Sequence, residues 1–340
     1  MKTKEDQKYN SIMNVRNFSK SCELLGPNIT NELLDLKCIV TEKIHGENFR
    51  VGVTETGDPF IGQRNQIFYV MYTGDISEPT WVGQSAHPNW NKLTSAARNK
   101  IDKLLGVCVM KFEETGTGFV FFGELCGNGL KTGFTYPWDG LSVLYFDVLF
   151  KERDEDAHYL AHRDAYYWMD YFNVPRVPVV ATQNTIREAL ALDVEAMKSE
   201  VTGDGFIEGV VIKPVDRLLV NAIWHSDHRL IIKHKTERYS EEAHRKVKVT
   251  VADINSPFCE FVTIARIEHA IEKIEENGNP IEYEMKDMQY IRNEVVQDIE
   301  REENNGYPLT PEDNKALNKF IPKVYAELLR EKTNAAFGII

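Results

Sequence analysis

The chain has 340 residues, of which 42% are hydrophobic and 27% charged, an ordinary composition for a soluble globular protein with a sizeable core. No apolar run reaches the roughly 18 residues that span a bilayer, and the charged start MKTKEDQKYN lacks the apolar segment of a signal peptide. We therefore expect a cytoplasmic protein without a membrane partner, in the host cytoplasm if the chain is viral. The net charge of −12 argues against non-specific coating of nucleic acid, although a local basic strip could still bind phosphates.

The cysteines are scattered and form no C-x-x-C pair. Their spacing predicts reduced thiols, and it favours neither a disulfide framework nor a zinc site. The five positions are Cys22, Cys38, Cys108, Cys126 and Cys259.

The first 250 residues predict an α+β fold. After a short helix near NITNELLDL, β-branched and aromatic segments predict strands at CIVTEKI, NFRVGVTE, GFVFFGELC, LSVLYFDVLF, GVVIKP and RLIIKHK. Between them, helical patterns occupy WNKLTSAARNKIDKLLGVCVMKFEE, HRDAYYWMDYFN and TIREALALDVEAMKSEV. Because strands and helices do not alternate regularly, we expect an antiparallel sheet with inserted helices.

The pattern changes after about Lys248, and residues 256–332 predict helices only. Apolar residues recur at helical spacing in PFCEFVTIARIEHAIEKIEEN and MKDMQYIRNEVVQDIEREENN. A third helix is expected to begin after Thr310, a suitable N-cap, with Pro311 at its first position. We predict a first domain over residues 1–248 and a small all-helical domain over residues 249–340.

The stretch TEKIHGENFRVGV, residues 41–53, places Lys43 at the end of a predicted strand. A lysine amine with its reference pKa of about 10.4 is protonated at neutral pH, so it must lose its proton before it attacks phosphorus. Nearby cations or a metal ion favour the neutral amine, and positive groups stabilise the charge on the phosphate oxygens. A nucleophilic Lys43 therefore requires further lysines, an arginine and metal-binding carboxylates at other strand ends.

The chain supplies such residues. Lys233 and Lys235 alternate along one predicted strand and should project from the same face, which is costly unless anions lie nearby. The other charged residues at predicted strand ends or within strands are Arg64, Glu124, Asp147, Glu208 and Lys213.

Taken in chain order from Lys43 to Lys235, these elements resemble motifs I, Ia, III, IIIa, IV and V of the covalent nucleotidyltransferases. This superfamily includes polynucleotide ligases and capping enzymes. Lys43-Ile44-His45-Gly46 resembles motif I, K-x-x-G. Within this superfamily, EKIHGENF, GELCGNGLKTGFTY, EGVVIKP and IIKHK are similar to the RNA ligase 2 family, the phage double-strand RNA ligases related to trypanosome editing ligases. The resemblance covers essentially the whole chain and implies an ATP-grasp-like ligase domain followed by helices.

The resemblance implies that ATP donates AMP and that Mg²⁺ is required, with Mn²⁺ able to substitute. Lys43 would attack the α-phosphate, Glu208 would hold the metal ion and Phe146 would stack on adenine. The other implied contacts are Arg64 and Glu124 with the ribose, Lys233 and Lys235 with the α-phosphate, Glu42 and Ile44 with the adenine edge, and Asn48 and Lys213 with the nucleotide.

The expected partner is RNA. We expect the ligase to seal nicks in duplex RNA or RNA–DNA hybrids, and to act as a monomer. The alternatives are an ATP-dependent DNA ligase or a GTP-using capping enzyme, which typically continue with an OB-fold and a basic motif VI, or a non-catalytic RNA-binding relative. Thr41 departs from the arginine that is often found two residues before the nucleophile in the phage family.

Several residues have a structural reading beside the functional one. Phe146 could belong to the core, since most strand aromatics do. His158 and His162 lack a complete ligand set and are expected at the surface. The role of His45 is left open. The strip from Lys233 through Arg238 to Lys248 is read equally as a solvated face and as a track for the nucleic-acid backbone.

Overall fold

The computed structural model describes residues 9, 12–25, 27–64, 66–73, 80–130, 134–152, 157–203, 205–216, 229–239, 256–276, 279–282, 284–304 and 306–336. The chain divides into two compact units, one formed by Met1–Asn10 with Phe18–His234 and the other by Ser11–Asn17 with Lys235–Ile340. The predicted boundary at residue 248 and the part of the predicted basic strip beyond residue 239 lie outside the described residues. Within the described ranges, no helix is both long and apolar enough to cross a bilayer.

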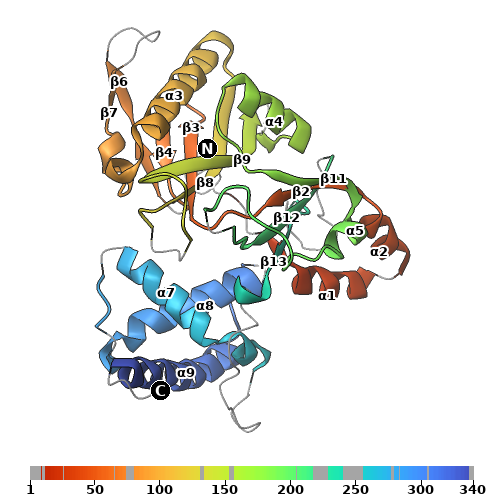
Figure 1. Ribbon diagram of the computed structural model, residues 1–340, viewed down its shortest axis with the longest axis vertical. Helices are drawn as coiled ribbons and strands as arrows, with labels where there is room; N and C mark the ends of the chain where they lie inside the picture. Colours follow the sequence, from red (N-terminus) through yellow and green to blue (C-terminus); the bar gives the residue numbers. More distant parts are fainter. Residues whose placement is uncertain are drawn as a thin grey trace. The chain divides into compact units, whose positions relative to one another are not determined.

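The larger sheet of the first unit has six strands, and every described pair of neighbours is antiparallel. This confirms the α+β class with antiparallel sheets (Figure 1). In spatial order, the strands are β10 (His158–Tyr159), β9 (Leu141–Lys151), β8 (Gly118–Gly127), β3 (Glu47–Val53), β4 (Pro59–Gly62) and β5 (Ile67–Tyr69).

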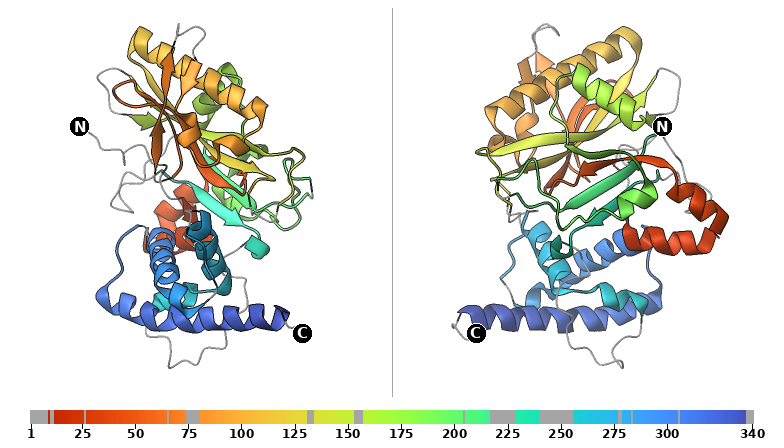
Figure 2. Two further views of the ribbon diagram at one scale, coloured as in Figure 1. Left: turned by 90° about the vertical axis from the view of Figure 1, so that its left-hand side faces the viewer. Right: turned by 45° about the vertical axis from the view of Figure 1, so that its right-hand side comes forward.

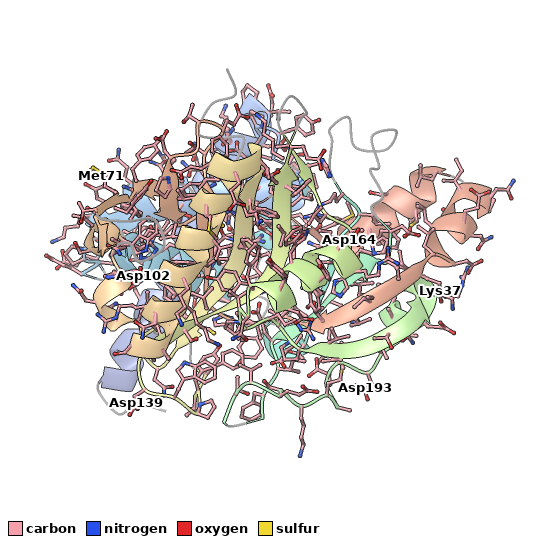
Figure 3. The ribbon with its side chains drawn as sticks, turned by 90° about the horizontal axis from the view of Figure 1, so that it is seen from above. Lys37, Met71, Asp102, Asp139, Asp164 and Asp193 are labelled. Carbon is pink, nitrogen blue, oxygen red and sulfur yellow. The ribbon has the colours of Figure 1, made fainter. Side chains whose placement is uncertain are left out.

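Two helices cover one face of this sheet, α3 (Ser95–Thr115) and α4 (His162–Tyr171) (Figure 2). Figure 3 shows them side by side, marked by Asp102 on α3 and Asp164 on α4. Phe119 and Phe121 of β8 face α4 and the residue that follows it, since their rings contact Trp168 and Phe172. Side chains alternate along a strand, so Phe122 and Glu124 belong to the opposite face of the sheet.

A second sheet contains, in order, β13 (Ile232–Lys235), β12 (Gly209–Pro214), β2 (Lys37–Glu42) and β11 (Val179–Thr185). A separate hairpin joins β6 (Met71–Thr73) and β7 (Thr80–Val82). β2 pairs antiparallel with β12, with Val210 opposite Glu42. The ladder continues one residue further, because the Lys43 N–H donates to the Gly209 carbonyl at 2.9 Å. Lys43 is therefore held beside the residue that follows Glu208.

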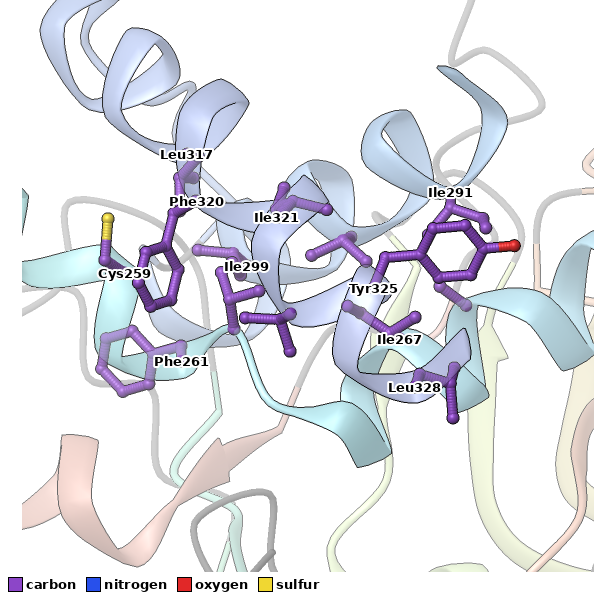
Figure 4. Close-up of a cluster of buried hydrophobic side chains, with 14 of the residues drawn as sticks. Cys259, Phe261, Ile267, Ile291, Ile299, Leu317, Phe320, Ile321, Tyr325 and Leu328 are labelled. Carbon is purple, nitrogen blue, oxygen red and sulfur yellow. The ribbon is translucent and has the colours of Figure 1, made fainter. Parts of the chain in front are cut away.

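The second unit contains the strand β1 (Met13–Asn14) and the helices α7 (Ile264–Glu276), α8 (Met288–Glu303) and α9 (Pro311–Ala336), with 3₁₀ turns at Pro257–Phe261 and Met285–Asp287. Its core is apolar and draws on all three helices (Figure 4), for example Ile267, Ile291, Ile299, Leu317, Ile321 and Tyr325. Thr310 caps α9 as predicted, since its hydroxyl oxygen accepts from the Asp313 N–H at 3.2 Å. In the described part of residues 256–332 there is no strand.

Some features of the structure differ from the prediction or were not predicted. The helix predicted over residues 185–201 is only α5 (Ile186–Leu190), because the following segment folds back and contacts Glu42. Helix α1 (Val15–Leu25), which precedes the correctly predicted α2 (Pro27–Leu34), and strand β11 were not predicted. His162, expected at the surface, is buried against the ring of Tyr166, with 3.9 Å between ring centroids. All five cysteines lie in the described part of the chain, and they are thiols outside any disulfide, as predicted.

Candidate active site

Lys43 and Glu208 form the centre of the candidate site. The Lys43 ammonium donates to Glu208 Oε2 at 2.7 Å, and only 3% of the Glu208 side chain is exposed. The pair follows from the strand register, which places Lys43 opposite Gly209. Nδ1 of His45 lies 3.1 Å from the same carboxylate oxygen. One buried carboxylate oxygen therefore lies within contact of both the amine and the imidazole.

Gly46 is required by a close approach of two chain segments. A Cβ atom at this position would lie 2.1 Å from the Leu125 carbonyl oxygen and 3.1 Å from Cγ of Glu124. No side chain larger than hydrogen fits without moving the β8 backbone. The glycine of the K-x-x-G motif thus brings the loop after β2 against the strand that carries Glu124.

Glu124 lies among charged groups at the end of this loop. The pKa of Glu124 is raised to about 7, mainly by burial: Glu208 and Glu47 also raise it, while Lys43 and Arg64 lower it. Four residues predicted for the site, Lys43, Arg64, Glu124 and Glu208, are therefore electrostatically coupled. Glu47 was not predicted and is held by Asn89, whose Nδ2 donates to Glu47 Oε2 at 2.9 Å.

Asn48 pairs with Glu124 across β3 and β8. Its side-chain oxygen is buried and has no hydrogen-bond partner. A buried acceptor of this kind is costly unless a further group binds there. The arrangement is compatible with a ligand that brings a cation or a hydrogen-bond donor to this position.

The Glu42 side chain is held by hydrogen bonds within the protein. Its buried carboxylate accepts hydrogen bonds from the Ser199 hydroxyl and, at 3.1 Å, from the Glu200 N–H. Burial raises its pKa, while the bonds from Ser199 and Glu200 oppose the rise. Its own N–H donates to the Pro178 carbonyl at 2.9 Å. The Glu42 side chain thus anchors the segment that leads to Glu208. Ile44, two residues after Glu42, is also buried.

Phe146 and Lys213 form a second cluster on β9 and β12. The ladder between β8 and β9 shifts register here: Phe122 faces Asp147, Gly123 faces Tyr145, and Phe146 is the extra residue of a bulge. The ammonium of Lys213 donates to the Phe146 carbonyl at 2.8 Å and lies 5.4 Å from the centre of the Phe146 ring. Lys213 is buried, and it therefore supports the bulged backbone directly.

A buried ion network surrounds Asp147 in this cluster. Its Oδ2 accepts from Arg229 at 2.7 Å, from the Tyr9 hydroxyl at 2.8 Å and from Lys213 at 3.2 Å. Burial alone would raise the pKa of Asp147, but Arg229 and Lys213 hold it well below its ordinary value. The Tyr9 ring packs edge-on against Phe146, with 5.0 Å between ring centroids. Tyr9 and Arg229 were not predicted, because no local pattern distinguishes them.

The two remaining predicted residues lie on β13. Lys233 is buried and Lys235 is half-buried. β13 is the neighbour of β12, so Lys233 lies in the sheet whose strands β2 and β12 directly adjoin Lys43 and Glu208 in the chain. Within the described ranges, no group of three or more histidine, cysteine or acidic residues could hold a metal ion.

The chain is similar to one protein family and to several solved structures. The family model described as RNA ligase matches residues 36–235. Similar solved structures include a Naegleria gruberi RNA ligase with PPi (17% identity, TM-score 0.46) and a mutant of it with ATP and Mn (18% identity, TM-score 0.44). Each match covers 70% of this chain and 58% of the Naegleria chain, so this chain spans less than two thirds of that length. No curated protein matches the chain.

Proposed function

The chain belongs to the RNA ligase family, and from this premise we propose that it is an ATP-dependent RNA ligase that joins 3′-OH and 5′-phosphate ends. The observation that carries the proposal is the ion pair of 2.7 Å between Lys43 and Glu208. In support of the proposal, this ion pair joins the candidate nucleophile to the candidate metal ligand at the end of one strand ladder, and both residues act electrostatically on Glu124 together with Arg64.

In the proposed first step, Nζ of Lys43 attacks the α-phosphorus of ATP. A nitrogen–phosphorus bond forms, the bond to the β-phosphate oxygen breaks, and pyrophosphate leaves. Lys43 must first give up a proton and its hydrogen bond to Glu208. In the second step, an oxygen of the RNA 5′-phosphate attacks the phosphorus of the lysine-bound AMP, and the nitrogen–phosphorus bond breaks. In the third step, an RNA 3′-OH attacks the adenylylated 5′-phosphate, the phosphodiester forms and AMP leaves.

The residues present fit a divalent cation bound together with nucleotide. Glu208 supplies a buried carboxylate, and the unpaired Asn48 oxygen is of the hard donor type that Mg²⁺ and Mn²⁺ accept. Mg²⁺ typically takes few protein ligands and completes its shell with phosphates and water. Such a cation would neutralise charge on the phosphate oxygens, and Glu208 would hold it.

The roles proposed for the other residues follow the family resemblance. Arg64, Glu124 and Asn48 would contact the ribose and phosphates, Lys233 and Lys235 the α-phosphate, and Ile44 and the Glu42 backbone the adenine edge. Phe146 would stack on adenine. For Lys213 we propose a supporting role, since its ammonium contacts the Phe146 carbonyl and Asp147.

We further propose nicked duplex RNA or an RNA–DNA hybrid as substrate, a monomeric enzyme in the cytoplasm, and a helical C-terminal domain that follows the nucleotidyltransferase domain. The helices α7, α8 and α9 favour an RNA ligase over DNA ligases and capping enzymes, which typically carry an OB-fold at this place. The intact set of Lys43, Glu208, Lys233 and Lys235 favours an enzyme over a non-catalytic RNA-binding relative.

The test is the intact mass of the purified protein after incubation with Mg²⁺ and ATP. We expect a gain of one AMP, absent with GTP and in Lys43→Ala. Lys37→Ala is the matched control, because Lys37 begins β2, the strand that leads to Lys43, but is exposed (Figure 3), and it should keep the adduct.

A gain of GMP would instead indicate capping chemistry. If protein that is initially free of adenylate gains no mass, the lysine mechanism is wrong and a binding module is the better interpretation. Nicked RNA and nicked DNA duplexes then decide the substrate.

A further inference from the structure

The segment that follows β8 folds back on itself through one asparagine. Nδ2 of Asn128 donates to the carbonyls of Tyr136 at 2.9 Å and Trp138 at 2.8 Å. In return, the Tyr136 N–H donates to Oδ1 of Asn128 at 2.8 Å. All three bonds come from one side-chain amide, so the course of the chain at Tyr136 is fixed by Asn128.

Tyr136 reaches from this segment to the K-x-x-G loop. Its hydroxyl donates to the His45 carbonyl at 2.7 Å, and its side chain is buried. Two residues earlier, the Phe134 ring packs on the His45 imidazole, with 5.0 Å between ring centroids. Burial raises the pKa of Tyr136 well above its ordinary value, so the hydroxyl keeps its proton and remains a donor.

The same segment also contacts the chain that leads to Glu208. The Gly203 N–H donates to the Thr135 carbonyl at 2.7 Å, five residues before Glu208. Adjacent residues, Thr135 and Tyr136, therefore contact the two chain segments that carry the carboxylate and the lysine. The loop after β2 is held at three points: Lys43 N–H on Gly209, the His45 carbonyl on Tyr136, and Gly46 against Leu125.

We propose that Tyr136, held by Asn128, is a positioning residue for Lys43: its hydroxyl sets the course of the K-x-x-G loop and thereby the place of the reacting amine. The inference rests on the proposed function, in which Nζ of Lys43 attacks ATP. Tyr136 acts through the backbone of His45 and contacts neither reacting atom. Small misplacements of a nucleophile are costly, because attack needs an aligned approach of about 3–3.5 Å.

The test compares Tyr136→Phe with Tyr166→Phe. Both variants lose one buried hydroxyl that donates to a backbone carbonyl, but the Tyr166 hydroxyl donates to Val177 at 3.1 Å, outside the K-x-x-G loop. The rate constant for AMP transfer to Lys43 is measured in a single turnover at saturating ATP, together with KM for ATP and thermal stability. We expect Tyr136→Phe to lower the rate constant about 10- to 100-fold with a smaller change in KM. The rate constant of Tyr166→Phe should stay within about 2-fold of the wild-type value. Its lost hydroxyl does not contact the K-x-x-G loop, so Lys43 should keep its place.

Asn128→Asp is the second variant, for use also if Tyr136→Phe folds poorly. It keeps the acceptor for the Tyr136 N–H but loses both donations, to the Tyr136 and Trp138 carbonyls. It should therefore also lower the rate constant for AMP transfer to Lys43. If the wild type is labelled and both variants match Tyr166→Phe, the positioning role is wrong. If the wild type itself gains no AMP, the proposed function fails first, and the positioning role fails with it.

Discussion

At the scale of single residues, Glu124 shows how neighbours set the charge of a side chain. Its pKa is raised to about 7, above the ordinary value of 4.5, because burial disfavours the carboxylate more than Lys43 and Arg64 favour it. The native protein therefore binds this proton more tightly than the unfolded chain. The resulting contribution to stability is present below about pH 4.5 and is lost as the pH rises through about 7.

Glu124→Gln should remove this dependence, because an amide does not titrate. In ligand-free protein, we expect the free energy of unfolding of the wild type to fall relative to that of the variant between about pH 5 and pH 8. Urea unfolding of both proteins at several pH values gives the difference directly. Other titrating groups, such as the buried His87 with its pKa lowered by burial to about 4, are common to both proteins and cancel. A constant difference across this range would contradict the assignment.

The residues of the Lys43 site were predictable because their motifs are short and local. Lys43 and Gly46 stand three apart, and Glu208 directly precedes a strand of buried residues. By contrast, the contact of Lys213 with the Phe146 carbonyl joins residues 67 apart in the chain. It depends on a one-residue bulge in β9, and no sequence periodicity shows where a ladder will slip.

At the scale of elements, the same distinction separates predicted from missed structure. The strand predicted at GVVIKP coincides with β12, because most of its residues are buried and its centre is a run of three β-branched residues. The helix predicted after Thr185 ends at Leu190 although its sequence favours helix. Ser199 and Glu200 leave that pattern and bond the buried carboxylate of Glu42. Tertiary hydrogen bonds to a buried charge outweigh the few tenths of a kcal/mol per residue of helix propensity.

The bulge at Phe146 leads to a prediction for Lys213. Lys213→Met keeps the aliphatic length but leaves the Phe146 carbonyl without its donor and Asp147 with one cation fewer. We expect the ligand-free protein to lose about 2 kcal/mol of stability, the cost of a buried hydrogen bond to a charged group. A lysine that only contacted nucleotide phosphates would leave the stability of ligand-free protein unchanged.

Urea unfolding followed by tryptophan fluorescence measures this loss, with Lys37→Met on the exposed start of β2 as control. Lys213→Met should also raise KM for ATP if Phe146 receives the adenine. A wild-type stability for Lys213→Met would return Lys213 to the direct nucleotide contact that the family resemblance implies.

At the scale of the whole molecule, each unit has its own interior. The first contains two sheets with α3 and α4, and the second an apolar cluster drawn from α7, α8 and α9. The helical unit also buries a charge: the side chain of Arg266 is 1% exposed, with Nη2 2.8 Å from Glu303 and Nε 3.0 Å from Asp298. The sequence showed the apolar faces of these helices, but an arginine on α7 is expected at the surface, so this network could not be predicted.

Removing Arg266 should destabilise the helical unit strongly. In Arg266→Met the carboxylate of Glu303, 3% exposed, loses this cation, whereas Asp298 keeps Arg301 and Lys273. Breaking a buried ion pair from one side costs about 3–5 kcal/mol, a large part of the stability of an ordinary domain. Lys286→Ala, which removes two exposed ion pairs on the same unit, is the matched control and should change stability little.

The two units can be followed separately, because all five tryptophans, at positions 81, 90, 138, 168 and 224, belong to the first unit. Circular dichroism at 222 nm also reports α7, α8 and α9. For Arg266→Met, we expect part of the signal at 222 nm to be lost at a lower urea concentration than in the wild type. The urea midpoint followed by tryptophan fluorescence should remain that of the wild type. An unchanged 222 nm transition would show that Arg266 contributes no net stability, and an equal shift of both midpoints would show that the units unfold as one.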